Sequence, residues 1–218
     1  LIMALNINGT TGISGVDASV SAPALTGTDS NSGISFPSAD TIKFSTGGVE
    51  RMSITNSGVS GITQGITMVD SWGLDSGQSL NSNDYISGWV RRTGTHGGNV
   101  GGAMSVSGTP NVFTFPSTGL YLMMLSIGWY SASVTHPYAG VKVYLDDDGD
   151  GSFSQVSSYY SSMQSGQYGR VVGNELFDVT SVSGSAFGLK FQVETAGAIS
   201  AQGGQGRTSA IFIKYGDT

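Results

Sequence analysis

Residues 111–122 read Asn111-Val112-Phe113-Thr114-Phe115-Pro116-Ser117-Thr118-Gly119-Leu120-Tyr121-Leu122, and the chain continues as a nearly unbroken apolar run to Tyr130. Pro116 and Gly119 predict a tight corner between two strands, because proline fixes φ and glycine accepts backbone conformations that other residues avoid. The apolar run that follows predicts a central strand covered on both faces. This stretch therefore predicts a β-sheet core built around Leu120–Tyr130.

Further strand-like runs occur at regular spacing on both sides of this corner, bounded by Gly, Asn and Asp. They are Ile66–Val69, Tyr85–Val90, Val112–Phe115, Gly140–Leu145, Arg170–Val179, Ala186–Val193 and Ser209–Tyr215. So many short strands within residues 65–218 are typical of a two-sheet sandwich or a jelly roll. We therefore predict an all-β fold with a jelly-roll β-sandwich over residues 65–218.

The first part of the chain has almost no aromatic residues and a weaker strand pattern. Short runs at 33–36, 41–45 and 51–54 are separated by turn signals, which predicts a β-rich segment over residues 25–64. Each strand offers only two or three side chains to a core, so the segment has to pack on copies of itself or on another protein. A flexible Gly/Ser tether is the alternative.

The composition excludes several classes of protein. The 218 residues include 34 Gly and no Cys, and only 11% are charged, so long helices, disulfide frameworks and thiolate metal sites are all disfavoured. A net charge of −6 disfavours nucleic acid as a partner, because binding phosphates requires clustered Lys and Arg. No apolar run approaches the roughly 20 residues that a membrane-spanning helix needs. The opening residues 1–5 are too short for a signal peptide and lack its basic flank.

The corner at residues 111–122 resembles the C1q/tumour-necrosis-factor jelly roll, whose members typically carry a Phe-x-x-Pro-x-x-Gly-x-Tyr pattern. The residues that match it in register are Phe113, Pro116, Gly119 and Tyr121. Residues 183–189 are similar to the small-residue turn and following strand of that family, and residues 208–215 are similar to its final strand. The resemblance implies a homotrimeric C1q-like head in which apolar surfaces pack around a threefold axis.

Residues 25–61 are similar to repeats that precede the terminal module in fibre and virion structural proteins of tailed phages. Together, the two resemblances imply a homotrimeric virion appendage with an N-terminal virion-attachment segment (1–24) that docks on another virion protein. A β-rich stalk or collar (25–64) would carry the C1q-like head (65–218) toward a host-surface glycan or protein. Two alternatives remain open: a capsid decoration or head-fibre protein, and a secreted bacterial C1q-like lectin.

An acidic run at residues 146–151 is the sharpest local motif. Asp146, Asp148 and Asp150, followed by Gly151, fit the first half of a calcium-binding loop, where hard carboxylate oxygens suit a hard cation. The twelfth position, which carries a bidentate Glu in such loops, is Ser157. The alternative is a polar hairpin turn in which Asp and Gly adopt positive φ, with no resident cofactor.

Two segments have the composition of a recognition surface. Residues 157–168 are rich in Tyr, Ser, Gly and Gln, and residues 201–207 form a Gly- and Gln-rich predicted loop. Tyrosine offers rigid amphipathic contact while the polar residues supply adaptable hydrogen bonds. The predicted ligand-binding residues are Tyr159, Tyr160, Tyr168, Gln202 and Arg207. An edge strand and loop at a trimer interface is the alternative for the first segment.

We predict that the protein is not an enzyme. The only bases that titrate near neutral pH are His96 and His136, and both are expected in loops. No Gly-x-Ser-x-Gly nucleophile elbow lies between a strand and a helix. Glu175 and Glu194 could form a glycosidase pair, but a surface position is the more frequent outcome for such residues.

Overall fold

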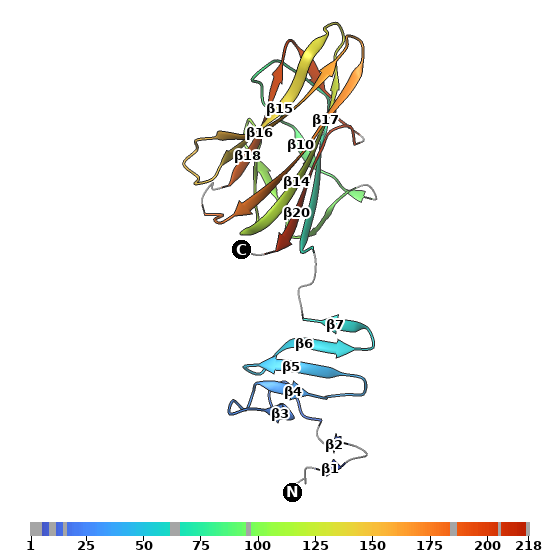
Figure 1. The fold of residues 1–218 in the computed structure, drawn as a ribbon, viewed down its shortest axis with the longest axis vertical. Helices are drawn as coiled ribbons and strands as arrows, with labels where there is room; N and C mark the ends of the chain where they lie inside the picture. The colour runs from blue at the N-terminus through green and yellow to red at the C-terminus, as the bar shows by residue number, and fades with distance from the viewer. Residues whose placement is uncertain are drawn as a thin grey trace. The chain divides into compact units, whose positions relative to one another are not determined.

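The computed structural model describes residues 6–8, 12–14, 17–61, 66–94, 97–183, 187–204 and 206–216. Within these ranges the chain is all-β, and no helix there is long or apolar enough to cross a bilayer. The chain divides into two compact units, residues 1–64 and residues 65–218 (Figure 1). The prediction of an all-β protein is therefore confirmed.

The N-terminal unit consists of a small hairpin and an antiparallel meander. The hairpin pairs β1 (Asn6–Asn8) with β2 (Gly12–Ser14). The meander runs in sequence order through β3 (Leu25–Thr26), β4 (Gly33–Ser35), β5 (Ile42–Thr46), β6 (Val49–Thr55) and β7 (Gly58–Ser60). Gly47 and Gly48 connect β5 to β6 with φ angles of 60° and 74°, a left-handed turn that favours glycine.

The register of the meander places its apolar side chains on one face. Phe44 pairs with both Ile34 and Met52, and Ile54 pairs with both Ile42 and Val59. The resulting N-terminal apolar face consists of Leu25, Ile34, Ile42, Phe44, Met52, Ile54 and Val59. Ile54 and Val59 remain 38% and 48% exposed, so this single sheet leaves much of its apolar face uncovered.

The C-terminal unit, called the head below, contains two antiparallel sheets. The first sheet has the order β10-β8-β20-β14-β19-β9, with β11 paired to β8 and β17 paired to β14. Its strands are β8 (Met68–Leu74), β9 (Gln78–Leu80), β10 (Trp89–Arg91), β11 (Asn99–Gly101), β14 (Gly119–Tyr130), β17 (Tyr168–Val179), β19 (Ile199–Ala201) and β20 (Ser209–Gly216). The second sheet has the order β12-β13-β18-β15-β16. Its strands are β12 (Ser105–Ser107), β13 (Val112–Thr114), β15 (His136–Asp146), β16 (Ser154–Met163) and β18 (Gly188–Thr195).

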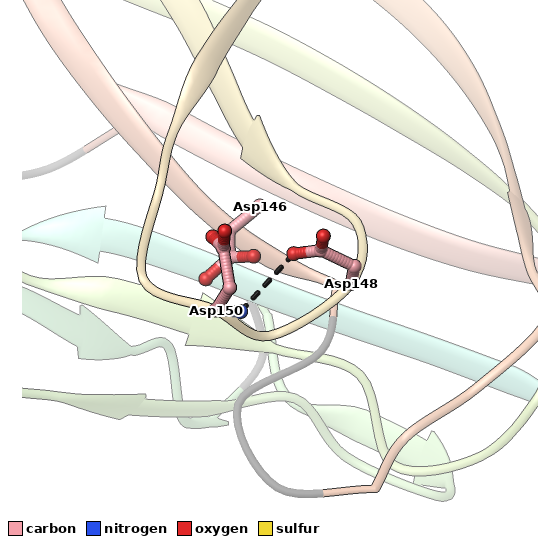
Figure 2. A group of neighbouring side chains, drawn as sticks. All are labelled: Asp146, Asp148 and Asp150. Carbon is pink, nitrogen blue, oxygen red and sulfur yellow. Dashed lines mark hydrogen bonds between the residues drawn. The ribbon is translucent and has the colours of Figure 1, made fainter.

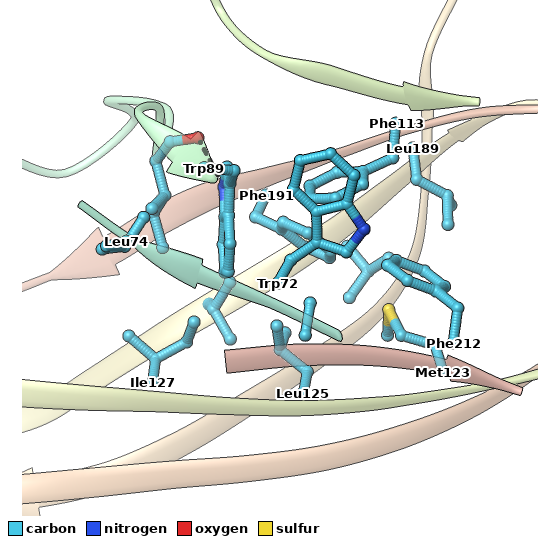
Figure 3. Close-up of a cluster of buried hydrophobic side chains, with 14 of the residues drawn as sticks. Trp72, Leu74, Trp89, Phe113, Met123, Leu125, Ile127, Leu189, Phe191 and Phe212 are labelled. Carbon is cyan, nitrogen blue, oxygen red and sulfur yellow. Dashed lines mark hydrogen bonds between the residues drawn. The ribbon is translucent and has the colours of Figure 1, made fainter. Parts of the chain in front are cut away.

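An aromatic cluster forms the centre of the head (Figure 3). Phe113 is fully buried, and its ring centroid lies 5.4 Å from that of Trp72 and 5.3 Å from that of Phe212. Trp89 and Phe191 complete the cluster at 5.5 and 5.6 Å from Phe113. Edge-to-face and tilted contacts of this kind add to the stabilisation that comes from burying the rings.

The corner that the sequence predicts between β13 and β14 is present. The hydroxyl of Tyr121 donates to the carbonyl oxygen of Ser117 at 3.0 Å while the Tyr121 ring is buried in the core. Gly119 has a φ of 136°, and a Cβ there would lie 2.4 Å from the backbone oxygen of Gly216. A residue without a side chain is therefore required where β14 begins.

Two predicted strands have different limits in the structure. The strand predicted at Tyr85–Val90 is mostly wrong, since the sheet ladder is confined to β10 and the φ of 70° at Gly88 interrupts an extended backbone before it. The strand predicted at Ile66–Val69 begins later and continues to Leu74 as β8. Ser71 and Gly73 interrupt the apolar pattern of β8 in the sequence, so the predicted strand ended too early.

Candidate functional site

A surface pocket of about 430 Å³ lies where the end of β14 meets the start of β17 and the loop between β19 and β20. Its lining residues are Gly128, Trp129, Tyr168, Gly169, Arg170, Gln202 and Arg207. Three of them, Tyr168, Gln202 and Arg207, are among the ligand-binding residues that the sequence predicts. The fold thus brings parts of both predicted recognition segments to one place, which we call the arginine pocket.

The arginine pocket depends on the register between β14 and β17 and on the glycine at position 128. β14 pairs with β17 so that Gly128 lies opposite Arg170, two residues from the Tyr130–Tyr168 pair and on the same face of the sheet. The carbonyl of Gly128 accepts a hydrogen bond from the backbone N–H of Gln202 at 2.7 Å. A Cβ at Gly128 would lie 2.6 Å from the backbone oxygen of Arg207. The absence of a side chain therefore lets Gln202 and Arg207 lie directly against the strand.

The side chains of the pocket form a connected surface. Arg207 Nη1 donates to Gln202 Oε1 at 3.3 Å, and the Arg207 guanidinium lies 5.8 Å from the centroid of the Tyr168 ring. Tyr168 in turn packs against Tyr130, with ring centroids 4.7 Å apart, and is itself 67% exposed. This arrangement presents an aromatic ring and a cation to solvent side by side.

Arg170 adds a second cation that the sequence analysis missed. Its Nη1 donates to Ser126 Oγ at 2.8 Å, which fixes the side chain along the outer surface of β14. No Asp or Glu lines the pocket, and neither Arg170 nor Arg207 forms an ion pair within the described part of the chain. Only the pairing of β14 with β17 places Arg170 in the pocket, so no local sequence motif could have identified it.

The other two predicted binding residues, Tyr159 and Tyr160, lie on β16 and do not line the arginine pocket. The Tyr159 hydroxyl lies 2.8 Å from the carbonyl oxygen of Asn174 and 2.5 Å from Glu175 Oε1. Burial, together with the hydrogen bond to Glu175, raises the pKa of Tyr159 to about 12. The Tyr160 hydroxyl donates to Glu194. Both phenols are therefore engaged by neighbouring strands.

The acidic run forms the hairpin loop between β15 and β16 (Figure 2). Carboxylate oxygens of Asp146, Asp148 and Asp150 all lie within 4.8 Å of one another. Asp146 is buried and accepts hydrogen bonds from the backbone N–H groups of Gly149 at 2.8 Å and Gly151 at 3.0 Å. The loop is thus closed by its own backbone hydrogen bonds, and it also gathers three oxygens at a spacing that a cation could use.

The prediction that His136 lies in a loop is wrong, because His136 begins β15 and is fully buried. Its Nε2 lies 3.1 Å from Ser131 Oγ, and its Nδ1 lies 2.8 Å from Thr195 Oγ1. Buried between two hydroxyl groups, the imidazole links three segments of the head and is closed to solvent. His96, the other histidine considered, lies outside the described residues.

Comparison with proteins of known structure identifies the type of fold in the head. No protein-family model and no curated protein matches the chain. Among solved structures, Eiger TNF from S. frugiperda superposes with a TM-score of 0.53 at 10% identity, covering 71% of this chain and 96% of that one. Murine APRIL at pH 5.0 gives a TM-score of 0.48 at 15% identity, covering 69% of this chain and 99% of that one. The likeness to Eiger TNF shows that the chain carries a tumour-necrosis-factor-type jelly roll, as the 111–122 corner predicts.

Proposed function

We propose that this chain is a homotrimeric virion appendage protein whose head attaches the particle to the surface of a host cell. The arginine pocket is the structural feature that best supports an attachment role. It gathers an aromatic ring, an amide and two guanidinium groups on one surface, from Tyr168, Gln202, Arg170 and Arg207. Both guanidinium groups keep N–H donors that the described hydrogen bonds do not engage. Exposed aromatic and cationic groups around a concavity are typical of binding sites.

An exposed apolar surface on the head supports self-association. On the outward side of β14, Leu122 pairs with Leu176 of β17 and with Ile213 of β20. The head apolar face consists of Leu120, Leu122, Met124, Val172, Leu176, Ile211 and Ile213. Val172 is 67% exposed and Leu176 is 56% exposed. A soluble protein rarely leaves such a contiguous apolar surface in water, so a second copy of the head is the occupant that we propose.

The N-terminal unit also has an apolar face that a second copy of the chain could cover. Its apolar face lies on a single sheet of short strands, and an isolated layer of this kind is only marginally stable. Three copies could enclose one shared core between three such faces. Both units of the chain therefore have a surface that oligomerisation would cover, and this agreement favours a trimer along the length of the chain.

The virion location rests on the similarity of residues 25–61 to repeats in phage fibre proteins. In this proposal residues 1–24 bind another virion protein, and the head is displayed toward a glycan or protein of the host. A capsid decoration or head-fibre protein is the second candidate, and it would use the same head on the shell of the particle. A secreted C1q-like lectin would use the same pocket without a particle.

We propose a binding role rather than a catalytic one. His136 is enclosed between Ser131 and Thr195, away from solvent. Glu175 and Glu194, the candidate carboxylate pair, accept hydrogen bonds from Tyr159 and Tyr160. Release of reducing ends from a host polysaccharide by the purified protein would contradict this role.

Immunogold labelling of intact particles with an antibody against the head tests the virion role. Gold at the tail, together with inhibition of infection by the purified protein, is the result that the attachment proposal predicts. Gold distributed over the capsid would instead support a decoration or head-fibre protein. Particles that bind no antibody, while the denatured virion proteins also lack the chain, would contradict any virion role.

A further inference from the structure

We propose that the arginine pocket binds a carboxylate-bearing sugar unit of an acidic surface polysaccharide. This inference rests on the proposed attachment function and adds the chemical class of the ligand. The binding groups are the guanidinium groups of Arg170 and Arg207, the ring of Tyr168 and the amide of Gln202.

The charge of the pocket is opposite to that of the chain. The sequence has 15 acidic and 9 basic residues, yet the pocket lining contains two arginines and no acidic residue. Two like charges at one concave site repel each other, and a bound anion offsets this repulsion by attracting both. An anionic ligand would supply the countercharge that no carboxylate of the described residues supplies.

Both guanidinium groups retain unused donors. The described hydrogen bonds engage one nitrogen of each group, with Arg170 donating to Ser126 Oγ and Arg207 donating to Gln202 Oε1. A guanidinium carries five N–H donors in a planar fork, which matches the two oxygens of a carboxylate. The two contacts hold the side chains in place and leave their remaining N–H groups for a ligand.

The aromatic surface favours a sugar over an acidic peptide. Tyr168 is 67% exposed, and its ring packs against that of its cross-strand partner Tyr130 at 4.7 Å, so the pocket presents an exposed ring with one packed neighbour. The C–H groups on one face of a pyranose pack on such a ring. The Gln202 amide donates to Ser200 and accepts one hydrogen bond from Arg207, which leaves one lone pair of its oxygen for a sugar hydroxyl group. The volume of about 430 Å³ lies within the range of small-ligand sites, about 300–1,000 Å³.

Calorimetric titration of the full-length protein with defined polymers tests this inference. The carboxylated probes are polygalacturonate, alginate and hyaluronate, and each is compared with its carboxyl-reduced, neutral form. Dextran sulfate and polyglutamate serve as anions without a sugar carboxylate. The variants are Arg170→Gln and Arg207→Gln, and Arg51→Gln in the N-terminal unit removes the same charge elsewhere as a matched control. Unchanged thermal unfolding of each variant confirms that it is folded.

We expect at least one carboxylated polysaccharide to bind the wild-type protein and the Arg51→Gln variant alike. Each pocket variant should bind it at least about tenfold more weakly, because each removes a charge-assisted hydrogen bond. Equal binding of the reduced polymer, or equally tight binding of polyglutamate, would overturn the carboxylated-sugar inference. The absence of binding to all three carboxylated polysaccharides would also overturn it. A separate infection assay distinguishes a wrong ligand class from a wrong attachment role. If only the ligand class is wrong, the purified protein still inhibits infection; if the attachment role is wrong, it does not.

Discussion

The guanidinium of Arg207 lies 5.8 Å from the centre of the Tyr168 ring, although the two residues come from separate predicted recognition segments. The contact exists because Gln202 and Arg207 lie against Gly128 of β14, and β14 also carries Tyr130, the cross-strand partner of Tyr168. The arginine pocket is therefore a product of tertiary packing, and its shape depends on a residue that has no side chain.

Replacing Gly128 by alanine should displace the backbone at Arg207. The new Cβ would lie 2.6 Å from the backbone oxygen of Arg207, a distance that forces the backbone to move. We expect a loss of about 1–3 kcal/mol in the free energy of unfolding, typical of overpacking. Urea denaturation measures it, with Gly216→Ala as the control because a Cβ there meets nothing within 4 Å. Equal stability of the two variants would show that the backbone at Arg207 is not held against the strand.

Asp70 should be one of the most sensitive positions in the head. Its fully buried carboxylate pairs with Arg91 at 2.9 Å and accepts hydrogen bonds from Trp72 Nε1 at 2.9 Å and Met104 N–H at 2.8 Å. Asp70→Asn removes the negative charge that pairs with Arg91, whose other described hydrogen-bond partner is the carbonyl oxygen of Met104, and we expect a loss of about 3 kcal/mol. The exposed Asp75→Asn is the matched control in chemical denaturation. A loss below about 1 kcal/mol for Asp70→Asn would contradict the description of this network.

The stability of the head should fall at alkaline pH partly because of Tyr159. Its pKa is raised from 10.0 to about 12 in the folded protein, so folding favours the protonated phenol. The stabilisation is complete below the unfolded value and is lost as pH rises from about 10 to about 12. Tyr159→Phe should flatten the pH–stability curve between about pH 10 and 12. Tyr215→Phe, a change at an exposed tyrosine, should leave the slope of the curve as it is in the wild-type protein. Identical slopes in the two variants would assign the alkaline loss to other groups.

The Asp146 loop should depend on its backbone hydrogen bonds more than on a cation. Asp146→Ala removes the acceptor for the N–H groups of Gly149 and Gly151, and we expect a loss of about 1–3 kcal/mol. Asp148→Asn should change stability by less than about 0.5 kcal/mol, because its side chain is exposed. We expect the wild-type melting temperature to be the same with calcium as with a chelator. A calcium-dependent rise that Asp148→Asn abolishes would instead establish a calcium site.

Sequence patterns predicted the parts of the fold that depend on local chemistry. The Pro116–Gly119 corner and the apolar run of β14 identified the centre of the head, because turn residues and continuous burial leave a local signature. The strand at β10 and the burial of His136 were not predicted correctly. The limits of β10 depend on the positive φ of Gly88, which the apolar pattern of residues 85–90 does not reveal. The burial of His136 depends on a contact far along the chain, its bond to Thr195, which no local pattern encodes.

The candidate site was predictable only in part, for the same reason. Composition alone marked Tyr168, Gln202 and Arg207 as surface residues suited to recognition. Arg170 and Gly128 enter the pocket through the register of β14 with β17, which is decided by the whole sheet. The composition of residues 157–168 also could not separate Tyr168 from Tyr159, whose hydroxyl bonds to a neighbouring strand.

Charged substitutions on the head apolar face should weaken self-association. Val172→Glu and Leu176→Glu place carboxylates on a surface that the trimer would cover, where desolvation of an unpaired charge is costly. Val90→Glu is a matched control, since Val90 is 44% exposed but lies on the edge strand β10. We expect the first two variants to reduce the mass measured by light scattering and the third to leave it unchanged. A uniform response of all three would contradict the placement of the interface.

Self-association is the claim on which the appendage role depends, because both units leave an apolar face uncovered in a single chain. Sedimentation equilibrium of the full chain over a range of concentrations tests it most directly. We predict one species of about 67 kDa, three times the chain mass of 22.4 kDa. A single species at the mass of one chain, stable up to high concentration, would contradict the trimer and with it the proposed appendage.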